Sequence, residues 1–193
     1  TNDVQILNNG YPMPAVGLGV YKIADEQMEE VVRTALDAGY RAFDTAYFYG
    51  NEKALGSALK HSNVERDELF ITSKLWNDYQ GYDQTIEYFN KSLDNLGLDY
   101  LDLFLIHWPC ENDQLYIESY KALEHLYEEG KIKAIGVCNF KIHHLEKLMK
   151  ETKITPQVNQ IELHPYFNQQ DVQDFCDEHE DRKSTRLNSS HPT

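Results

Sequence analysis

The sequence has few cysteines. Only three occur among its 193 residues, at Cys110, Cys138 and Cys176. Their odd number and wide spacing exclude a disulfide framework and any CxxC motif. Unpaired thiols are typical of proteins in reducing compartments, so this pattern favours a cytoplasmic protein.

Basic residues are scarce as well. Lys and Arg number 18 against 32 Asp and Glu, which gives a formal net charge of −14. A chain this acidic is repelled by phosphate backbones and by anionic lipid, so we expect neither nucleic acid nor a membrane as a partner. No apolar run approaches the ~20 residues of a membrane span, and the first residues carry no signal-peptide pattern.

Two common ligand-binding patterns are also missing. The histidines form no HExxH motif and no close ligand pair with a carboxylate, so we expect no metal site. Gly17 and Gly19 could begin a dinucleotide-binding GxGxxG loop, but its third glycine would fall on Lys22. This excludes a Rossmann fingerprint, and we expect the two glycines to allow close packing at a strand end.

The sequence does contain a regular alternation of strand-like and helix-like segments. Strand-like segments begin near residues 15, 41, 69, 101, 132 and 157, roughly every 28 residues. Helical patterns follow at residues 25–39, 51–60, 83–96, 114–128, 142–150 and 169–178, and Asp25 is a candidate cap for the first. A small β-hairpin is expected before them, within residues 4–14.

This alternation predicts a parallel α/β sheet, either doubly wound or closed as a (β/α) barrel. Only six βα units are found, whereas an eight-unit barrel typically needs ~250 residues. Residues 181–193, DRKSTRLNSSHPT, have no apolar period. We therefore expect a partial barrel over residues 1–180, followed by a foreign or disordered tail.

Polar residues close three successive apolar strands. Asp44, Lys74 and His107 each come at the end of a strand, and Tyr49 lies in the loop after Asp44. In a parallel barrel these strand ends face the active site. A phenol with a pKa near ~10 needs a nearby cation to act as an acid at neutral pH, and a buried cation needs a carboxylate. The plainer alternatives are a solvated Lys and a His that caps its strand.

Two further strands end in groups that form hydrogen bonds. Cys138 and Asn139 follow the fifth strand, and Gln160 ends the sixth. The amides of Asn139 and Gln160 offer both donors and acceptors at the same edge of the sheet. Loop capping explains either amide alone, but it explains the two together less well.

These motifs resemble the aldo-keto reductases, in particular the bacterial group of 2,5-diketo-D-gluconate and glyoxal reductases. The likeness runs from about Val4 to Glu180 and rests on the following stretches: Gly39-Tyr40-Arg41-Ala42-Phe43-Asp44-Thr45-Ala46, Tyr49-Gly50-Asn51-Glu52, Ile71-Thr72-Ser73-Lys74-Leu75-Trp76, Leu98-Asp99-Tyr100-Leu101-Asp102-Leu103, His107-Trp108-Pro109, Ile135-Gly136-Val137 with Asn139-Phe140, and Asn159-Gln160-Ile161-Glu162.

The resemblance implies a (β/α)8 TIM barrel that reduces aldehydes or ketones with NADPH, on small dicarbonyl or keto-sugar-like substrates. By it, Tyr49 is the general acid, and Lys74 lowers the pKa of Tyr49 while pairing with Asp44. His107 orients the carbonyl group. A monomer is implied for the complete protein.

The resemblance also implies where ligands bind. Cys138, Asn139 and Gln160 would hold the nicotinamide amide, and Tyr21, Trp76 and His107 would contact the substrate. Cys138 departs from the family's usual Ser, and a thiol is a weaker donor than a hydroxyl. The family's nicotinamide-stacking aromatic and its 2′-phosphate-binding cations follow strands seven and eight, so we expect neither in this sequence.

Three alternatives remain open at this point. The chain could be a shortened NADPH-dependent reductase, a non-catalytic barrel that serves as a partner-binding subunit, or a fragment without a stable fold of its own. The full set of four polar residues favours the reductase, because a binding subunit has no need of them.

Overall fold

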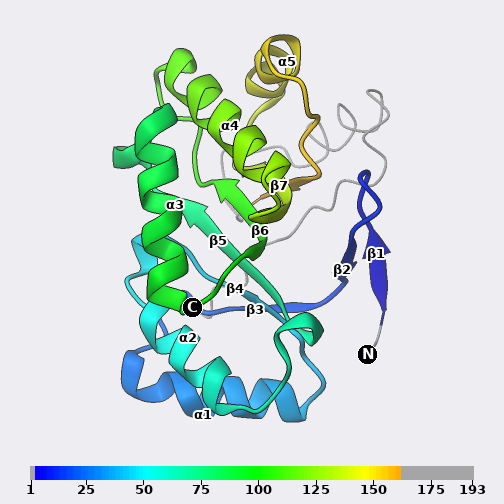
Figure 1. The fold of residues 1–193 in the computed structure, drawn as a ribbon, viewed down its shortest axis with the longest axis vertical. Helices are drawn as coiled ribbons and strands as arrows, with labels where there is room; N and C mark the ends of the chain where they lie inside the picture. Colours follow the sequence, from blue (N-terminus) through cyan, green and yellow to red (C-terminus); the bar gives the residue numbers. More distant parts are fainter. Residues whose placement is uncertain (1–2, 162–193) are drawn as a thin grey trace.

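The structure is a computed structural model that describes residues 3–161. Its first element is a two-stranded antiparallel hairpin, β1 (Val4–Ile6) and β2 (Pro12–Pro14), which confirms the predicted hairpin. The turn between these strands closes with a hydrogen bond from the Gly10 amide to the Leu7 carbonyl, 2.8 Å long. In Figure 1 the hairpin stands beside the main sheet.

Six parallel strands form the main sheet, and their order in space follows their order in the chain. They are β3 (Gly17–Gly19), β4 (Ala42–Asp44), β5 (Phe70–Leu75), β6 (Leu101–Ile106), β7 (Ile132–Cys138) and β8 (Val158–Gln160). A doubly wound sheet reverses its strand order at a switch point, whereas a barrel does not. The sequential order therefore decides in favour of the barrel type.

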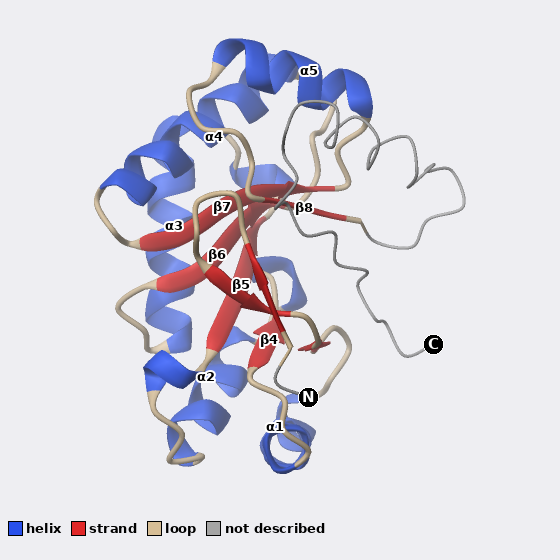
Figure 2. Cartoon of the chain, turned by 90° about the vertical axis from the view of Figure 1, so that its right-hand side faces the viewer, coloured by secondary structure: helices blue, strands red, loops and turns tan. Residues whose placement is uncertain are grey.

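Within residues 3–161, five α-helices connect the strands and lie along one side of the curled sheet (Figure 2). They are α1 (Asp25–Asp37), α2 (Glu52–His61), α3 (Tyr82–Leu96), α4 (Asp113–Glu128) and α5 (Ile142–Glu151). Short 3-10 turns occur at η1 (Tyr47–Tyr49), η2 (Arg66–Glu68) and η3 (Asn77–Tyr79).

Two details of the predicted elements are wrong. Asp25 does not cap α1: the cap position is Ala24, and no side chain bonds to the free amides there. Strand β5 is longer than expected, so Lys74 lies within it and not after it. The helix expected at residues 169–178, the domain boundary at 180 and the tail at 181–193 all lie outside the described residues.

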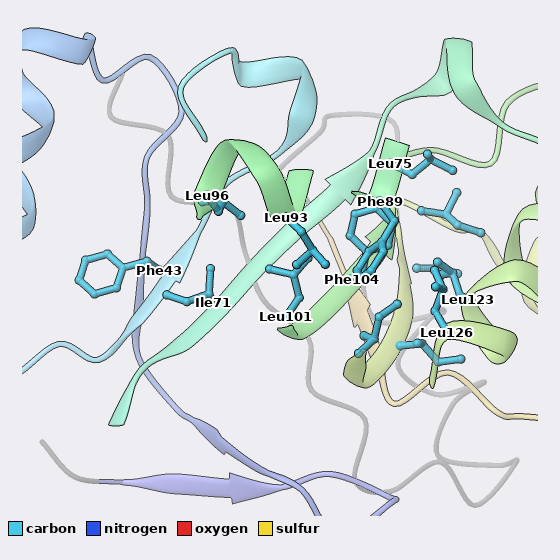
Figure 3. Close-up of a cluster of buried hydrophobic side chains, with 14 of the residues drawn as sticks. Phe43, Ile71, Leu75, Phe89, Leu93, Leu96, Leu101, Phe104, Leu123 and Leu126 are labelled. Atoms are coloured by element: carbon cyan, nitrogen blue, oxygen red, sulfur yellow. The ribbon is translucent and has the colours of Figure 1, made fainter. Parts of the chain in front are cut away.

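The sheet buries apolar side chains on both faces. On the outer face, strand residues such as Phe43, Ile71 and Phe104 pack against Phe89 and Leu93 of α3 and against the other helices (Figure 3). The inner face carries a second cluster, to which the hairpin contributes, formed by Leu7, Met13, Ala42, Phe70, Leu103, Leu105, Ala134, Cys138 and Val158. A sheet buried on both faces matches the near-continuous apolar strands of the sequence.

The described end of the sheet depends on a close approach between strands. A methyl group at Gly136 of β7 would collide with the backbone carbonyl of Val158 on β8. Only glycine allows β8 to pair in this position. Gly136 thereby helps to place Gln160, at the end of β8, opposite Cys138 at the end of β7.

Candidate active site

The inner face of the sheet carries polar side chains at its carboxyl end. Side chains two positions apart along a strand share a face. The inner face therefore ends in Asp44 on β4, Lys74 on β5, Cys138 on β7 and Gln160 on β8, while His107 directly follows β6. The structure thus brings together residues that are up to 116 positions apart in the chain.

Lys74 is the cation that the sequence led us to expect. Its side chain is fully buried, forms an ion pair with Asp44, and donates to the backbone carbonyl of Thr45 at 3.1 Å. Burial is the largest influence and opposes the charge on Lys74, but the Asp44 carboxylate, together with smaller contributions from Tyr49 and Cys138, raises the pKa of Lys74 above its ordinary value. Lys74 is therefore charged at neutral pH.

Asp44 connects two elements of the site. Besides Lys74, it accepts a hydrogen bond from the Gln160 side-chain amide at 2.5 Å. This bond joins β4 to β8 across the inner face of the sheet. Gln160 therefore helps to hold the ion pair, a contact that sequence reasoning did not anticipate because it depends on how far the sheet curls.

Tyr49 lies beside the buried cation. Turn η1 presents its ring so that the Lys74 ammonium lies 5.2 Å from the ring centre. The two groups are electrostatically coupled, because ionised Tyr49 raises the pKa of Lys74.

His107 completes the group of four predicted catalytic residues. Its ring lies edge-on to Tyr49, with 5.8 Å between ring centres. Its backbone is held on both sides: its amide donates to the Leu75 carbonyl at 3.1 Å, and its carbonyl accepts from the Asn139 side chain at 3.0 Å. The buried ring is thereby fixed next to the phenol.

Aromatic side chains lie next to Tyr49 and His107. Tyr21 packs 4.8 Å from it, and Trp76 lies 5.5 Å from His107. Phe48, which is half exposed, stacks on Trp76 at 3.8 Å. Sequence reasoning missed Phe48, although a large apolar side chain between two polar loop residues is a usable signal.

The three predicted cofactor-binding residues lie together at the edge formed by β7 and β8. The Asn139 amide donates to the Cys138 sulfur at 3.2 Å, and the Cys138 thiol donates to the Gln160 carbonyl oxygen at 3.5 Å. Asn139 has a left-handed backbone with φ of 63°, which Asn tolerates better than most residues. Two amides and a thiol supply the donors and acceptors that a carboxamide ligand requires.

The described residues contain neither a candidate metal cluster nor a candidate membrane span. Among residues 3–161, no three His, Cys, Asp or Glu side chains are grouped in a way that could hold a metal ion. Within the same part of the chain, no helix is both long and apolar enough to cross a bilayer.

Comparison with known proteins places this arrangement in a family. Glyoxal reductase of Bacillus subtilis (strain 168) is 51% identical over 175 residues, which make up 90% of this chain and 63% of the relative. The crystal structure of an aldo/keto reductase from Brucella melitensis is 44% identical, with a TM-score of 0.89, over 96% of this chain and 71% of that one. The Bombyx mori aldo-keto reductase, crystallised with NADP, is 31% identical, with a TM-score of 0.89, over 98% and 66% of the two chains.

The chain thus spans less than two thirds of the length of the glyoxal reductase. The sequence profile of the aldo/keto reductase family matches residues 15–183. The sequential parallel sheet agrees with this match. On both grounds, this chain belongs to the aldo/keto reductase family.

Proposed function

We propose that this chain provides the catalytic residues of an NADPH-dependent reductase that converts small aldehydes and ketones to alcohols. The observation that carries the proposal is the fully buried Lys74, paired with Asp44 and placed beside the Tyr49 ring. Burying a charge is costly unless it is paired, and a lysine in this setting is more often functional than structural.

Tyr49 acts as the general acid in this proposal. Its phenol donates a proton to the carbonyl oxygen as negative charge develops there. Lys74 favours loss of that proton through its positive charge, and Asp44 keeps Lys74 charged. Without the carboxylate, burial would drive Lys74 toward its neutral form, and the help given to Tyr49 would be lost.

His107 and the aromatic side chains orient the substrate. The His107 ring, fixed next to Tyr49, is placed to hydrogen-bond to the same carbonyl oxygen. Tyr21, Trp76 and Phe48 offer flat apolar walls to the rest of the molecule. A small dicarbonyl such as the substrate named for the glyoxal reductase would fit between such walls, because it needs one polar contact and little depth.

NADPH supplies the hydride when bound. The chemistry of Cys138, Asn139 and Gln160 fits the carboxamide of its nicotinamide, since together they offer sulfur, carbonyl and amide groups at one edge. Cys138 makes the weakest of these contacts, because a thiol is a poor donor. As the family resemblance implies, we expect the complete protein to work as a monomer.

We assign this reductase activity to a complete protein with the length of the relatives, and not to the 193-residue chain alone. Within the described residues, β3 and β8 each have a strand on one side only, and such edges leave backbone groups unpaired. We expect the 193-residue chain alone to turn over no substrate. The remaining length can be supplied by joining this chain to the residues of the Bacillus subtilis glyoxal reductase that the match does not cover. We call this protein the completed hybrid.

The test is NADPH consumption by the completed hybrid when glyoxal is added, with the 193-residue chain assayed alongside. Tyr49→Phe removes the transferable proton, so turnover should fall by roughly 10²-fold or more while NADPH still binds. Near-full turnover by this variant would refute the acid role. A cooperatively folding and active 193-residue chain would show instead that the hybrid is unnecessary.

A further inference from the structure

The cap residue of α2 does not cap its helix. Asn51 occupies the position directly before Glu52, where an Asn side chain usually accepts a bond from an amide of the first turn. Its side chain makes no such bond. Asn112 holds the equivalent position before α4 and does cap that helix, accepting from the amides of Gln114 and Leu115 at 3.0 and 3.3 Å.

The Asn51 side chain bonds to two other loops. Its amide nitrogen donates to the Val20 carbonyl at 2.8 Å, and its oxygen accepts from the Thr45 hydroxyl, also at 2.8 Å. Asn51 is 3% exposed and Thr45 is completely buried. Both bonds are therefore shielded from water. In the protein interior, hydrogen bonds are strong and costly to break.

These two bonds enclose the turn that carries Tyr49. Thr45 and Asn51 lie on either side of η1, so the bond between them closes a loop of the chain around Tyr49. The Thr45 carbonyl is also the second acceptor of the Lys74 ammonium. Val20, the other partner, directly precedes Tyr21, whose ring packs on Tyr49.

The first residue of α2 fixes the same region from the opposite side. Glu52 is buried and accepts from the Ser73 hydroxyl at 2.6 Å and from the Asn95 amide at 3.0 Å. Ser73 is the strand residue directly before Lys74. The start of α2 is thus anchored to β5 and α3, which gives Asn51 a rigid base.

We propose that Thr45 and Asn51 form a latch that sets the position of Tyr49 relative to Lys74. Both are positioning residues: they act through the Tyr49 turn and through the Thr45 carbonyl, and we assign them no contact with substrate. The inference rests on the proposed function, because it names what holds the acid in place. Positioning of this kind matters, since small displacements of a reacting group can cost large factors in rate.

Thr45→Val in the completed hybrid tests the latch. Valine has the shape of threonine but cannot donate to Asn51, whereas Thr45→Ser retains the hydroxyl. We expect Thr45→Val to lower kcat by roughly tenfold with unchanged NADPH binding, and Thr45→Ser to restore most of the loss. Asn112→Ala is the matched control, because it removes a true helix cap and should reduce stability without changing kcat.

A second readout does not depend on turnover. If the latch holds Tyr49 near Lys74, Thr45→Val should move the release of the Tyr49 proton, followed by NMR of labelled tyrosine, to higher pH. If the hybrid shows no turnover but this shift still occurs, the proposed function is refuted and the latch is supported. An unshifted titration, or a kcat equal to that of the unmodified hybrid, would overturn the latch. If Thr45→Val does not fold, Thr45→Ala, which also removes the hydroxyl but places no added methyl group against the Asn51 oxygen, is read by the same two measurements.

Discussion

Each end of the sheet holds a carboxylate paired with a cation, and we propose that the two pairs serve different purposes. At the carboxyl end, Asp44 pairs with the fully buried Lys74 and accepts from Gln160. At the amino end, Asp102 pairs with Arg66 at 2.8 Å and accepts from the Tyr11 hydroxyl at 2.5 Å. The chemistry of the two pairs is alike, but their neighbours are not.

At the amino end, every partner of the Asp102–Arg66 pair belongs to the hairpin, to the strands or to the residues flanking them. Asp102 also accepts from the Ile71 backbone amide at 2.8 Å, so it joins the hairpin, through Tyr11, to the start of β5. Arg66 donates in addition to the carbonyls of Leu69 and Tyr100. This pair holds the base of the sheet together, and the phenol beside it bonds to the carboxylate.

The two phenols show what the difference means. Tyr11 lies beside a carboxylate, and burial together with Asp102 raises the pKa of Tyr11 well above its ordinary value. Tyr49 lies beside an ammonium group, which favours proton release. We therefore propose that a carboxylate locks a tyrosine as a structural donor, whereas a cation held by a carboxylate prepares one for acid catalysis.

The largest expected effect is on the carboxyl-end pair. Asp44→Asn leaves Lys74 buried without its counter-charge, and breaking a buried pair in this way costs about 3–5 kcal/mol. Urea unfolding of the completed hybrid measures this loss, and turnover should fall as well. A variant as stable as the unmodified hybrid would contradict the view that Asp44 keeps Lys74 charged.

The amino-end pair should be less sensitive. Asp102→Asn leaves Arg66 with two carbonyl acceptors and partial access to water, because the Arg66 side chain is 23% exposed. We expect a loss of about 1–3 kcal/mol in the same unfolding experiment. Turnover per folded molecule should stay unchanged, and a drop in kcat would mean that the two ends are coupled.

A smaller effect should follow from Tyr11 as pH rises. Folding raises the pKa of Tyr11, so its contribution is fully present below the unfolded value near 10 and declines as pH rises beyond it. Tyr11→Phe should cost about 1 kcal/mol at neutral pH. Tyr11→Phe should also make the free energy of unfolding decline less steeply as pH rises above 10. The remaining slope should come from other groups whose pKa is also raised in the folded state, among them Lys74 and Tyr116.

The smallest effect is expected at Cys138. Cys138→Ser replaces a weak donor by a hydroxyl, so NADPH should bind more tightly by about 0.5–1 kcal/mol, the net value of one hydrogen bond. Titration of NADPH into the completed hybrid measures this change. Weaker binding would show that the Cys138 thiol contributes packing on the inner face instead of a hydrogen bond.

The sequence allowed the sheet and its polar end to be predicted, because a strict βα period leaves few places for strand ends. Asp44, Lys74 and His107 could be grouped on that basis alone. The latch could not: Thr45 and Asn51 look like an ordinary turn residue and an ordinary helix cap. Which hydrogen bond Asn51 makes depends on where Val20 lies, and only the packed fold places Val20 there.

The network around Asp102 was missed for a similar reason. Asp102 lies in an apolar strand, and the partners that justify its burial, Tyr11 and Arg66, come from segments 91 and 36 positions away. Nothing local to any of the three residues indicates the pairing. Side-chain bonds between distant segments depend on tertiary packing, which hydrophobic periodicity does not report.

The decisive measurement is a titration of the two phenols in the same protein. Tyrosine ring carbons labelled for NMR, assigned with Tyr11→Phe and Tyr49→Phe, report the pH at which each phenol loses its proton. We predict that Tyr49 releases its proton at lower pH than Tyr11, and that Lys74→Met reduces the difference. If Tyr49 titrated at the same pH as Tyr11 or above it, Lys74 would not prepare Tyr49 as an acid, and the contrast between the two ends of the sheet would fail.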